Sequence, residues 1–198
     1  MPNSFELAPW RSPLSRALHR NRSQVHSRFF QLATVTPDGL PTNRTVVFRG
    51  FVDETNCFKI ITDRRSQKIG HLTQRNQAEI AWYFTKTREQ FRLSGTIETV
   101  TEDDVNSDFF QERKRTWKAI SDNARIQFAW PCPAEQRSHN SEDFELEAPN
   151  PINPLDSFVL LIFQPHTVDH LELRGNPQNR FLYKRLPTNF WEKREVNP

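Results

Sequence analysis

Residues 62–68, which read Thr-Asp-Arg-Arg-Ser-Gln-Lys, bring three cations and two hydroxyls together in one short segment. The segment follows an apolar run and precedes residues with helical spacing, so it is expected at a strand-to-helix junction. The first turn of a helix offers unpaired N–H groups and the positive end of the helix dipole, and both attract anions. The composition therefore suits a phosphate dianion. A solvated basic turn without a ligand is the commoner explanation for an isolated cluster of this kind.

Two more segments carry residues that could do chemistry. Residues 44–49 read Arg-Thr-Val-Val-Phe-Arg, and two cations five positions apart on a strand are expected on opposite faces. One of them could meet a phosphate and the other a group beside it. Residues 176–183 read Asn-Pro-Gln-Asn-Arg-Phe-Leu-Tyr, which places amides and a guanidinium just before an aromatic strand. By turn chemistry alone, this segment is an Asn-rich turn that closes a hairpin.

The elements that must position these residues are mostly short strands joined by polar turns. Connections of this length favour an antiparallel meander over parallel crossovers. Strands are expected at 29–36, 42–51, 57–62, 78–84, 90–100, 157–163, 167–173, 181–186 and 191–196. Helices are expected at 13–28 (as one helix or two), from Ser66 as N-cap to about 75, at 102–117 and at 118–128.

These elements predict a mainly β fold of the α+β class, a small closed or partly closed barrel of about six or seven antiparallel strands with helices at its edges. A chain of 198 residues fits one domain. Residues 132–156 are rich in Pro, Asn and Glu and lack periodicity. They are therefore expected to form a long irregular loop or lid and not a domain boundary.

Composition narrows the choice of partners. The apolar content is weighted towards aromatic residues, with 16 Phe and 5 Trp against a single Met, which suits flat and rigid walls. Residues 1–75 hold 12 Lys/Arg against 5 Asp/Glu, which points to an anionic partner. Apolar strands interrupt these cations, so a small phosphorylated ligand explains them at least as well as nucleic acid. Neither a membrane span nor a signal peptide is recognised, and a cytoplasmic protein is expected.

Several kinds of site have no counterpart in the sequence. The glycines form neither a Rossmann fingerprint nor a P-loop, and no Gly-x-Ser-x-Gly elbow is present. Cys57 and Cys132 are far apart without metal-type spacing, so they are expected to be reduced structural thiols. His166 and His170 are expected on one face of a strand, but no nearby Cys or paired carboxylate completes a metal site. No metal is predicted.

Taken together, the three segments resemble the pyridoxamine 5′-phosphate oxidase-like, FMN-binding split-barrel superfamily, especially its branch that ends in Leu-Arg-Gly-Asn-Pro-Gln-Asn-Arg. The similarity runs from about residue 28 to 198 in the right order. It implies one FMN-binding domain over residues 1–198, folded as a six- to seven-stranded antiparallel split β-barrel with flanking helices. It also implies a homodimer with FMN at the subunit interface, and neither nucleic acid nor a membrane as partner.

The flavin motifs of the family can be followed along this chain. The family's Arg-x-Val-Leu-Leu-Lys strand resembles residues 44–49, with Arg49 in place of Lys, and its Tyr-Thr-Asn-x-x-Ser-Arg-Lys segment resembles residues 61–68. Gln67 replaces the phosphate-contacting Arg of that segment, so Arg64 or Arg65 is a candidate to supply the lost charge. Cations and helix N–H groups would take the phosphate, an amide would read the ring edge and a guanidinium would stabilise reduced flavin. The FMN-binding residues that the resemblance implies are Arg44, Thr45, Val46, Val47, Arg49, Ile61, Thr62, Ser66, Gln67, Lys68, Gln90 and Arg180.

The implied substrate site departs from that of the oxidases. Where the oxidases carry Arg-x-His-Asp-Arg before the last strands, this chain has Asn-Pro-Gln-Asn-Arg at residues 176–180. Asn176 and Gln178 thus replace the Arg and His that grip the substrate, although amides can still hydrogen-bond a neutral ligand. Arg49 and Arg113 are the other substrate-binding residues that the resemblance implies. No catalytic residue is identified.

For function, the resemblance implies an FMN-dependent oxidoreductase that oxidises an amine or an alcohol, with pyridoxamine or pyridoxine 5′-phosphate as the leading small-molecule substrate. A non-catalytic flavin carrier or sensor is the alternative. A third reading is a small barrel that binds nucleic acid through its basic N-terminal third. Because a fold does not settle function, the visible spectrum of the protein and a substrate test are needed to separate these readings.

Overall fold

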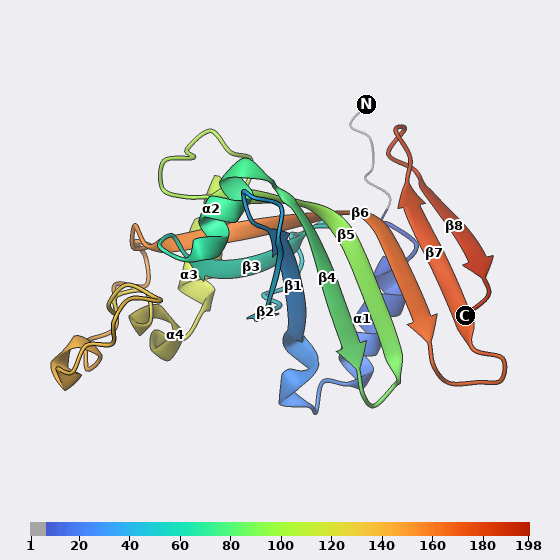
Figure 1. The fold of residues 1–198 in the computed structure, drawn as a ribbon, viewed down its shortest axis with the longest axis horizontal. Helices are drawn as coiled ribbons and strands as arrows, with labels where there is room; N and C mark the ends of the chain where they lie inside the picture. Colours follow the sequence, from blue (N-terminus) through green and yellow to red (C-terminus); the bar gives the residue numbers. More distant parts are fainter. Residues whose placement is uncertain (1–6) are drawn as a thin grey trace.

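The computed structural model describes residues 7–198. Over this range, eight strands form one curled antiparallel sheet in the order β2-β1-β4-β5-β6-β7-β8, and β3 pairs with β6 off this path (Figure 1). The strands are β1 (Phe29–Val35), β2 (Pro41–Val47), β3 (Phe58–Asp63), β4 (Gln77–Phe84), β5 (Glu89–Val100), β6 (Phe158–Glu172), β7 (Asn179–Arg185) and β8 (Trp191–Val196). The mainly β fold with flanking helices is confirmed, with eight strands in the described residues where six or seven were predicted.

The sheet splits along β6. The first half of β6 pairs with β3 and the second half with β7, while β5 accompanies both halves on the other side. Two separate strands were predicted here, but the structure has one strand whose pairing with β5 shifts between Ser94 and Gly95. A Cβ on Gly95 would lie 2.1 Å from the carbonyl oxygen of Gln164. Glycine is therefore required for the two strands to approach each other at this bulge.

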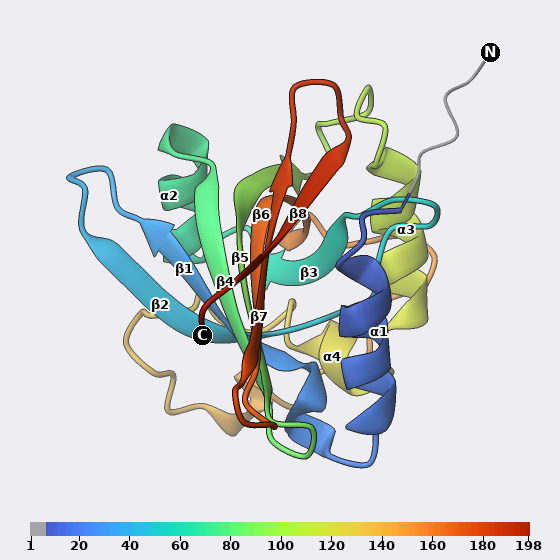
Figure 2. The same ribbon diagram turned by 90° about the vertical axis from the view of Figure 1, so that its right-hand side faces the viewer.

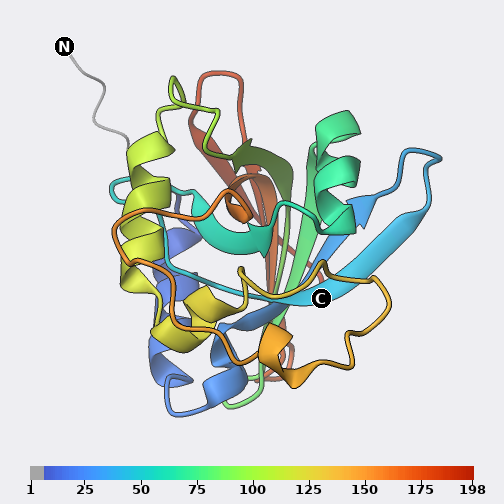
Figure 3. The same ribbon diagram turned by 90° about the vertical axis from the view of Figure 1, so that its left-hand side faces the viewer.

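The helices pack around the sheet, with α1, α3 and α4 on one side of the barrel and α2 on the other (Figures 2 and 3). α3 begins eight residues later than predicted, because the Asp104 carboxylate accepts hydrogen bonds from the N–H and hydroxyl of Thr101 and fixes a turn there. Ser66 precedes α2 as expected, but its side chain makes no capping hydrogen bond. The helices are α1 (Arg11–Arg20), α2 (Gln67–Gln74), α3 (Phe110–Ala119) and α4 (Asp122–Ile126), with the 3-10 turns η1 (Val25–Arg28) and η2 (Ser141–Asp143).

Aromatic side chains make up much of the interior. The main core holds Trp10, Phe58 and Trp82 together with aliphatic residues of the sheet, and the rings of Trp10 and Phe58 meet edge to face with centroids 5.9 Å apart. A smaller cluster contains Phe128 and Phe158, whose ring centroids are 5.1 Å apart. Phe128 of this cluster lies just after α4, at the start of the irregular loop. The cluster therefore packs the base of that loop against the fold.

Residues 127–157 connect α4 to β6 and contain no strand, and η2 is the one regular turn described within them. The irregular loop expected at 132–156 is therefore present. In Figure 3 this segment, coloured yellow to orange, passes below β2. Within residues 7–198, no helix is long and apolar enough to cross a membrane.

Candidate functional site

A cavity of about 600 Å³ lies between the barrel and the irregular loop. Its first wall, called here the barrel wall, comes from β2, the turn after β2, the end of β3 and the start of α2. Its second wall, the loop wall, comes from α4 and residues 127–144. Eight of the predicted FMN-binding residues line the barrel wall: Arg44, Thr45, Val46, Val47, Arg49, Ile61, Thr62 and Lys68.

Arg44 lies on β2, and neutral acceptors hold its guanidinium. Nη1 donates to Thr34 Oγ1 at 2.7 Å and to the carbonyl of Leu32 at 3.1 Å, and Nη2 donates to Thr42 Oγ1 at 2.8 Å. Burial lowers the pKa of Arg44, but a guanidinium remains charged at neutral pH. Because none of these partners is ionised, the positive charge of Arg44 is available to an anion in the cavity.

Lys68 lies in the first turn of α2. Its Nζ donates to Thr62 Oγ1 at 2.8 Å and to Ser66 Oγ at 2.5 Å. Burial and the nearby charge of Arg44 lower the pKa of Lys68 to about 8, against the opposing influence of Asp63. An anion beside Lys68 would favour its charged form again. The predicted junction at 62–68 thus brings the ammonium of Lys68 and the hydroxyl of Thr62 to one end of the cavity, while Ser66, which does not line it, accepts a hydrogen bond from Lys68.

Arg49 corrects one expectation. Arg44 and Arg49 were predicted on opposite faces of one strand, but β2 ends at Val47 and Gly50 has a φ of 104°, so the chain turns and both arginines line the cavity. Burial, and then the charge of Arg28, lower the pKa of Arg49. Its Nε is buried and has no hydrogen-bond partner among residues 7–198. Because an unsatisfied buried donor is costly, this atom indicates that a ligand acceptor belongs beside it.

Arg44, Arg49 and Lys68 are referred to below as the cation group. In the part of the chain that the structure describes, none of the three forms an ion pair with a carboxylate. Three cations that share one partly buried space repel one another unless an anion joins them. The barrel wall therefore has the charge to hold an anion.

Arg64 and Arg65, the candidates for the charge lost at Gln67, form ion pairs in this structure. Arg64 pairs with Glu102 at 3.2 Å and with Asp103 at 2.8 Å. Arg65 pairs with Asp63 at 2.7 Å. Neither arginine lines the cavity, and Gln67, the first residue of α2, does not line it either. Both arginines, which the sequence left as candidates for the phosphate, thus serve other contacts.

The loop wall was not among the predicted site residues. It includes three aromatic residues, Phe128, Trp130 and Phe144, that line the cavity. Trp130 Nε1 donates to the carbonyl of Phe144 at 3.1 Å, and the two rings meet edge to face with centroids 5.8 Å apart. The Arg137 guanidinium lies 5.0 Å from the centroid of the Phe144 ring. The sequence signal was the Phe-Ala-Trp-Pro-Cys-Pro run at 128–133, where two aromatic residues are followed by two prolines that restrict the backbone.

Two predicted flavin contacts lie elsewhere on this chain. Gln90 is near the start of β5, opposite Leu171 of β6, and Arg180 is on β7. The Arg180 guanidinium donates to both carboxylate oxygens of Asp169, at 3.0 and 2.8 Å. Neither residue lines the cavity. The predicted set is therefore divided between the cavity and the β5–β7 part of the sheet.

The predicted substrate contacts are similarly dispersed. Arg113 is buried in α3 and donates to the carbonyls of Phe158 and Leu155, at 2.8 to 3.1 Å, so it holds the start of β6 and does not line the cavity. Asn176 and Gln178 lie in the turn between β6 and β7, where the Asn176-Pro177 bond is cis. Of the four predicted substrate residues, Arg49 alone lines the cavity.

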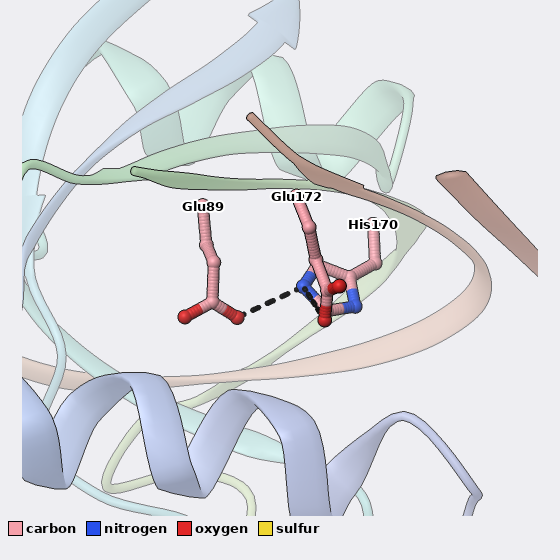
Figure 4. Close-up of side chains that lie close together, drawn as sticks. All are labelled: Glu89, His170 and Glu172. Atoms are coloured by element: carbon pink, nitrogen blue, oxygen red, sulfur yellow. Dashed lines mark hydrogen bonds and ion pairs between the residues drawn. The ribbon is translucent and has the colours of Figure 1, made fainter. Parts of the chain in front are cut away.

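A separate cluster joins Glu89, His170 and Glu172 (Figure 4), whose nearest ligand atoms all lie within 4.8 Å of one another. His170 Nε2 lies 3.0 Å from a Glu89 oxygen and 3.9 Å from a Glu172 oxygen. The sequence argument against a metal assumed that no carboxylates neighbour His170, and in this it was wrong. His166, expected on the same face, is the extra residue at the β5–β6 bulge and is exposed.

A hydrogen bond between His170 and Glu89 explains this second cluster. Glu89 and Glu172 are directly paired across β5 and β6, and two carboxylates at such positions repel each other. Burial acts to raise the pKa of Glu89, but hydrogen bonds from His170 and Thr87 outweigh it and lower the pKa. The imidazole thus relieves the repulsion, and we assign no metal to the cluster.

Comparison with known proteins finds relatives over the whole chain. The family described as "Pyridoxamine 5′-phosphate oxidase, FMN-binding domain" matches residues 7–101. "Pyridoxine/pyridoxamine 5′-phosphate oxidase 2" of Arabidopsis thaliana is 34% identical over 196 residues, which cover 97% of this chain and 98% of the relative. "Pyridoxine/pyridoxamine 5′-phosphate oxidase" of Sinorhizobium fredii is 37% identical, but over 84 residues that cover 42% of this chain and 39% of the relative.

Solved structures agree with this result. A "pyridoxamine 5′-phosphate oxidase-related, FMN binding protein" from Nostoc punctiforme superposes with a TM-score of 0.95 at 50% identity, covering 98% of this chain and all of that one. PhzG from Burkholderia lata, solved with tetrahydrophenazine-1-carboxylic acid, superposes with a TM-score of 0.76 at 22% identity, covering 100% of this chain and 94% of that one. At this lower identity the likeness bears on the fold alone.

Proposed function

The chain belongs to the pyridoxamine 5′-phosphate oxidase family of FMN-binding proteins, and from this premise we propose that it is an FMN-dependent oxidoreductase acting on a small amine or alcohol. FMN is the cofactor of the matched domain. One observation carries the proposal: the cation group lines a cavity of about 600 Å³ without a carboxylate partner among residues 7–198. A phosphate dianion is the ligand that best compensates this charge.

The residues present fit FMN. At the phosphate end, Lys68 Nζ already points with the hydroxyls of Thr62 and Ser66 into one cluster, and Arg44 adds a second charge. The start of α2 adds N–H groups and the positive end of its dipole. The unpartnered Nε of Arg49 fits a further acceptor on the ligand. The loop wall, with Phe128, Trp130 and Phe144, closes the opposite side of the cavity.

When bound, FMN supplies the acceptor for a hydride from the substrate carbon. The residues of this chain would bind and orient the reactants. Lys68, Thr62 and Arg44 would hold the phosphate end of the cofactor. The half-buried Arg49 would stabilise negative charge that develops in a site shielded from water. The loop wall would exclude water from the opposite side.

We also infer a homodimer with shared sites. Gln90 and Arg180, the two flavin contacts implied by resemblance, do not line the cavity of their own chain. If the two subunits share their FMN sites, Gln90 and Arg180 of each subunit complete the cavity of the other. Mixed dimers test this: one subunit carries Arg44→Ala with Lys68→Ala and the other carries Arg180→Ala. Sharing predicts one intact site per mixed dimer, whereas sites built within single chains leave none.

Pyridoxamine or pyridoxine 5′-phosphate is the leading substrate. The similarity to the Arabidopsis oxidase over nearly the whole chain supports it. Asn176 and Gln178 stand against it, because they replace charged groups that grip a substrate phosphate in the resembling oxidases, and an amide binds phosphate more weakly than a guanidinium does.

The test is a visible spectrum followed by an anaerobic titration. The purified protein is expected to bind FMN with flavin absorbance, and pyridoxamine 5′-phosphate is expected to bleach that absorbance without oxygen. A protein that binds FMN but is not bleached by amines or alcohols of this class would favour the flavin carrier or sensor. A protein that does not bind added FMN would contradict the proposal as a whole.

A further inference from the structure

Arg65 connects the two walls of the cavity. It lies in the turn between β3 and α2, where its backbone N–H and Nε donate to Asp63 Oδ1 at 2.7 and 2.9 Å and its Nη2 donates to Asp63 Oδ2 at 2.7 Å. The same Nη2 donates to the carbonyl of Trp130 at 3.0 Å and lies 3.5 Å from that of Phe128. One guanidinium therefore joins the barrel wall at Asp63 to the first residues of the loop wall.

The contact has a fixed geometry. Asp63 holds the guanidinium with two parallel hydrogen bonds, a fork that only arginine forms. The Arg65 side chain is 34% exposed and that of Asp63 is 15% exposed, so solvent screens the pair only in part. The hydrogen bonds to Asp63 raise the pKa of Arg65, and Cys132 and Glu135 of the loop are close enough to act in the same direction. The Arg65 guanidinium thus lies between Asp63 and the loop.

Few side-chain hydrogen bonds hold the main chain of the loop wall in place. Arg65 holds the carbonyl of Trp130, and the indole N–H of Trp130 donates to the carbonyl of Phe144. The Phe144 ring in turn packs against Arg137. At Phe128, Ser157 Oγ donates to the carbonyl at 2.7 Å and secures the base of the loop. From the β3–α2 turn, the backbone N–H of Arg64 reaches the base of the loop at the carbonyl of Ser157, at 2.7 Å, and the Arg65 side chain reaches Trp130.

We propose that Arg65 is a positioning residue, which holds the main chain at Phe128 and Trp130 against the β3–α2 turn and so places the aromatic loop wall opposite the substrate. Arg65 acts on the substrate through the loop and not by contact, since it does not line the cavity. The part of this statement that concerns substrate rests on the proposed function. The part that concerns the position of the loop does not.

Arg64 provides a matched control. It is the adjacent arginine, it is similarly exposed at 43%, and its partners Glu102 and Asp103 lie outside the cavity. Arg64→Ala therefore removes the same charge from the same turn without touching the loop wall. Arg65→Lys retains a positive charge beside Asp63 but loses the fork, and it is the conservative variant.

The first measurement is trypsin cleavage after Arg137, which is exposed on the loop, followed by mass spectrometry. Because cleavage reports the population of the opened loop, losing a charge-assisted hydrogen bond predicts a rate about tenfold higher in Arg65→Ala than in the parent. Arg65→Lys is expected to lie between the two, and Arg64→Ala is expected to match the parent. An unchanged rate in Arg65→Ala, or equal increases in Arg64→Ala and Arg65→Ala, would overturn the proposal.

The second measurement separates the loop from the cofactor. Arg65→Ala leaves the Asp63 carboxylate unpaired at the edge of the cavity, where it repels a phosphate. The double variant Asp63→Asn/Arg65→Ala removes that repulsion. It is expected to bind FMN within about twofold of the parent, because it keeps the cation group, yet to show the faster cleavage after Arg137. Restored protection in the double variant would overturn the proposal.

The third measurement uses pyridoxamine 5′-phosphate as the probe. If the loop faces the substrate, the double variant raises KM about tenfold while FMN affinity stays near that of the parent. An unchanged KM would overturn the substrate part of the proposal. A parent protein that binds no FMN would contradict the proposed function, while the cleavage comparison would still decide whether Arg65 holds the loop.

Discussion

The two walls of the cavity differ in how the chain builds them. The barrel wall is made by regular elements, β2, β3 and α2, that are close in sequence, and its polar groups are cations and hydroxyls. The loop wall comes from residues 124–144, has little regular structure, and is held by side chains that bond main-chain carbonyls. One wall is specified by local sequence and the other by contacts between distant segments.

The difference indicates a division of labour. A cofactor shared by many relatives needs the same charges in the same places, and a sheet and a helix N-terminus keep them there. Loops on a rigid scaffold can vary without loss of the fold, so under the proposed function the loop wall is free to suit the substrate. The match of the FMN-binding family to residues 7–101, which include the barrel wall but not the loop wall, follows this division.

The largest expected effect is on the barrel wall. Replacing Arg44 and Lys68 together by Ala removes two charge-assisted hydrogen bonds to the phosphate, which predicts FMN binding at least about 100-fold weaker. Fluorescence titration with FMN measures this change. Arg64→Ala is the control and should stay within about twofold of the parent. Parent-like affinity in the double variant would show that the phosphate is bound elsewhere.

A smaller effect is expected from pH. Lys68 has a pKa of about 8, so its charge is lost as the pH rises through that value, and FMN affinity is expected to fall several-fold between about pH 7 and about pH 9.5. The stability of the FMN-free protein should change in the opposite sense. Because the folded pKa lies below the ordinary 10.5, the unfolded chain binds more protons between these values, and stability rises with pH there.

Lys68→Arg sharpens the pH comparison. Arginine keeps its charge throughout this range, so the variant is expected to bind FMN with an affinity that is flat between about pH 7 and about pH 9.5. Titrations of parent and variant in the same buffers measure the difference. An equal fall in both proteins would assign the pH dependence to another group.

A third effect concerns stability. Arg49→Leu removes a half-buried guanidinium whose Nε has no partner in residues 7–198. The FMN-free variant is therefore expected to melt about 2 °C higher than the parent, while the rise in Tm on adding FMN becomes smaller. Differential scanning fluorimetry with and without FMN measures both. A lower Tm in the FMN-free variant would mean that Arg49 is satisfied without a ligand.

The smallest effect is expected at the β6–β7 turn. Asn176 is exposed and lines no part of the cavity, so Asn176→Ala should change FMN affinity by less than about twofold. Arg180→Ala, four residues away, is the comparison, and is expected to weaken FMN binding if the dimer shares its sites. An equal loss in the two variants would make the whole turn part of the cofactor site.

The local sequence pattern was sufficient to predict most of the residues that form the barrel wall. Thr62, Ser66 and Lys68 could be assigned to a strand-to-helix junction because charge, hydroxyls and periodicity change within a few residues there. The same reasoning failed for Arg49, since a strand that ends at Val47 cannot be told by alternation from one that continues. It also failed at Arg65, whose type suits a phosphate but whose nearest acceptors are Asp63 and two loop carbonyls.

The sequence by itself determined the mainly β fold, the basic strand-to-helix junction at 62–68 and the family, because these depend on periodicity and on residues close together in the chain. Only the tertiary structure decided which cations share the cavity, that the loop forms its second wall, and that two carboxylates meet His170. These depend on where distant segments pack against one another. Such contacts are selected by the free energy of the whole fold, and no single segment carries that information.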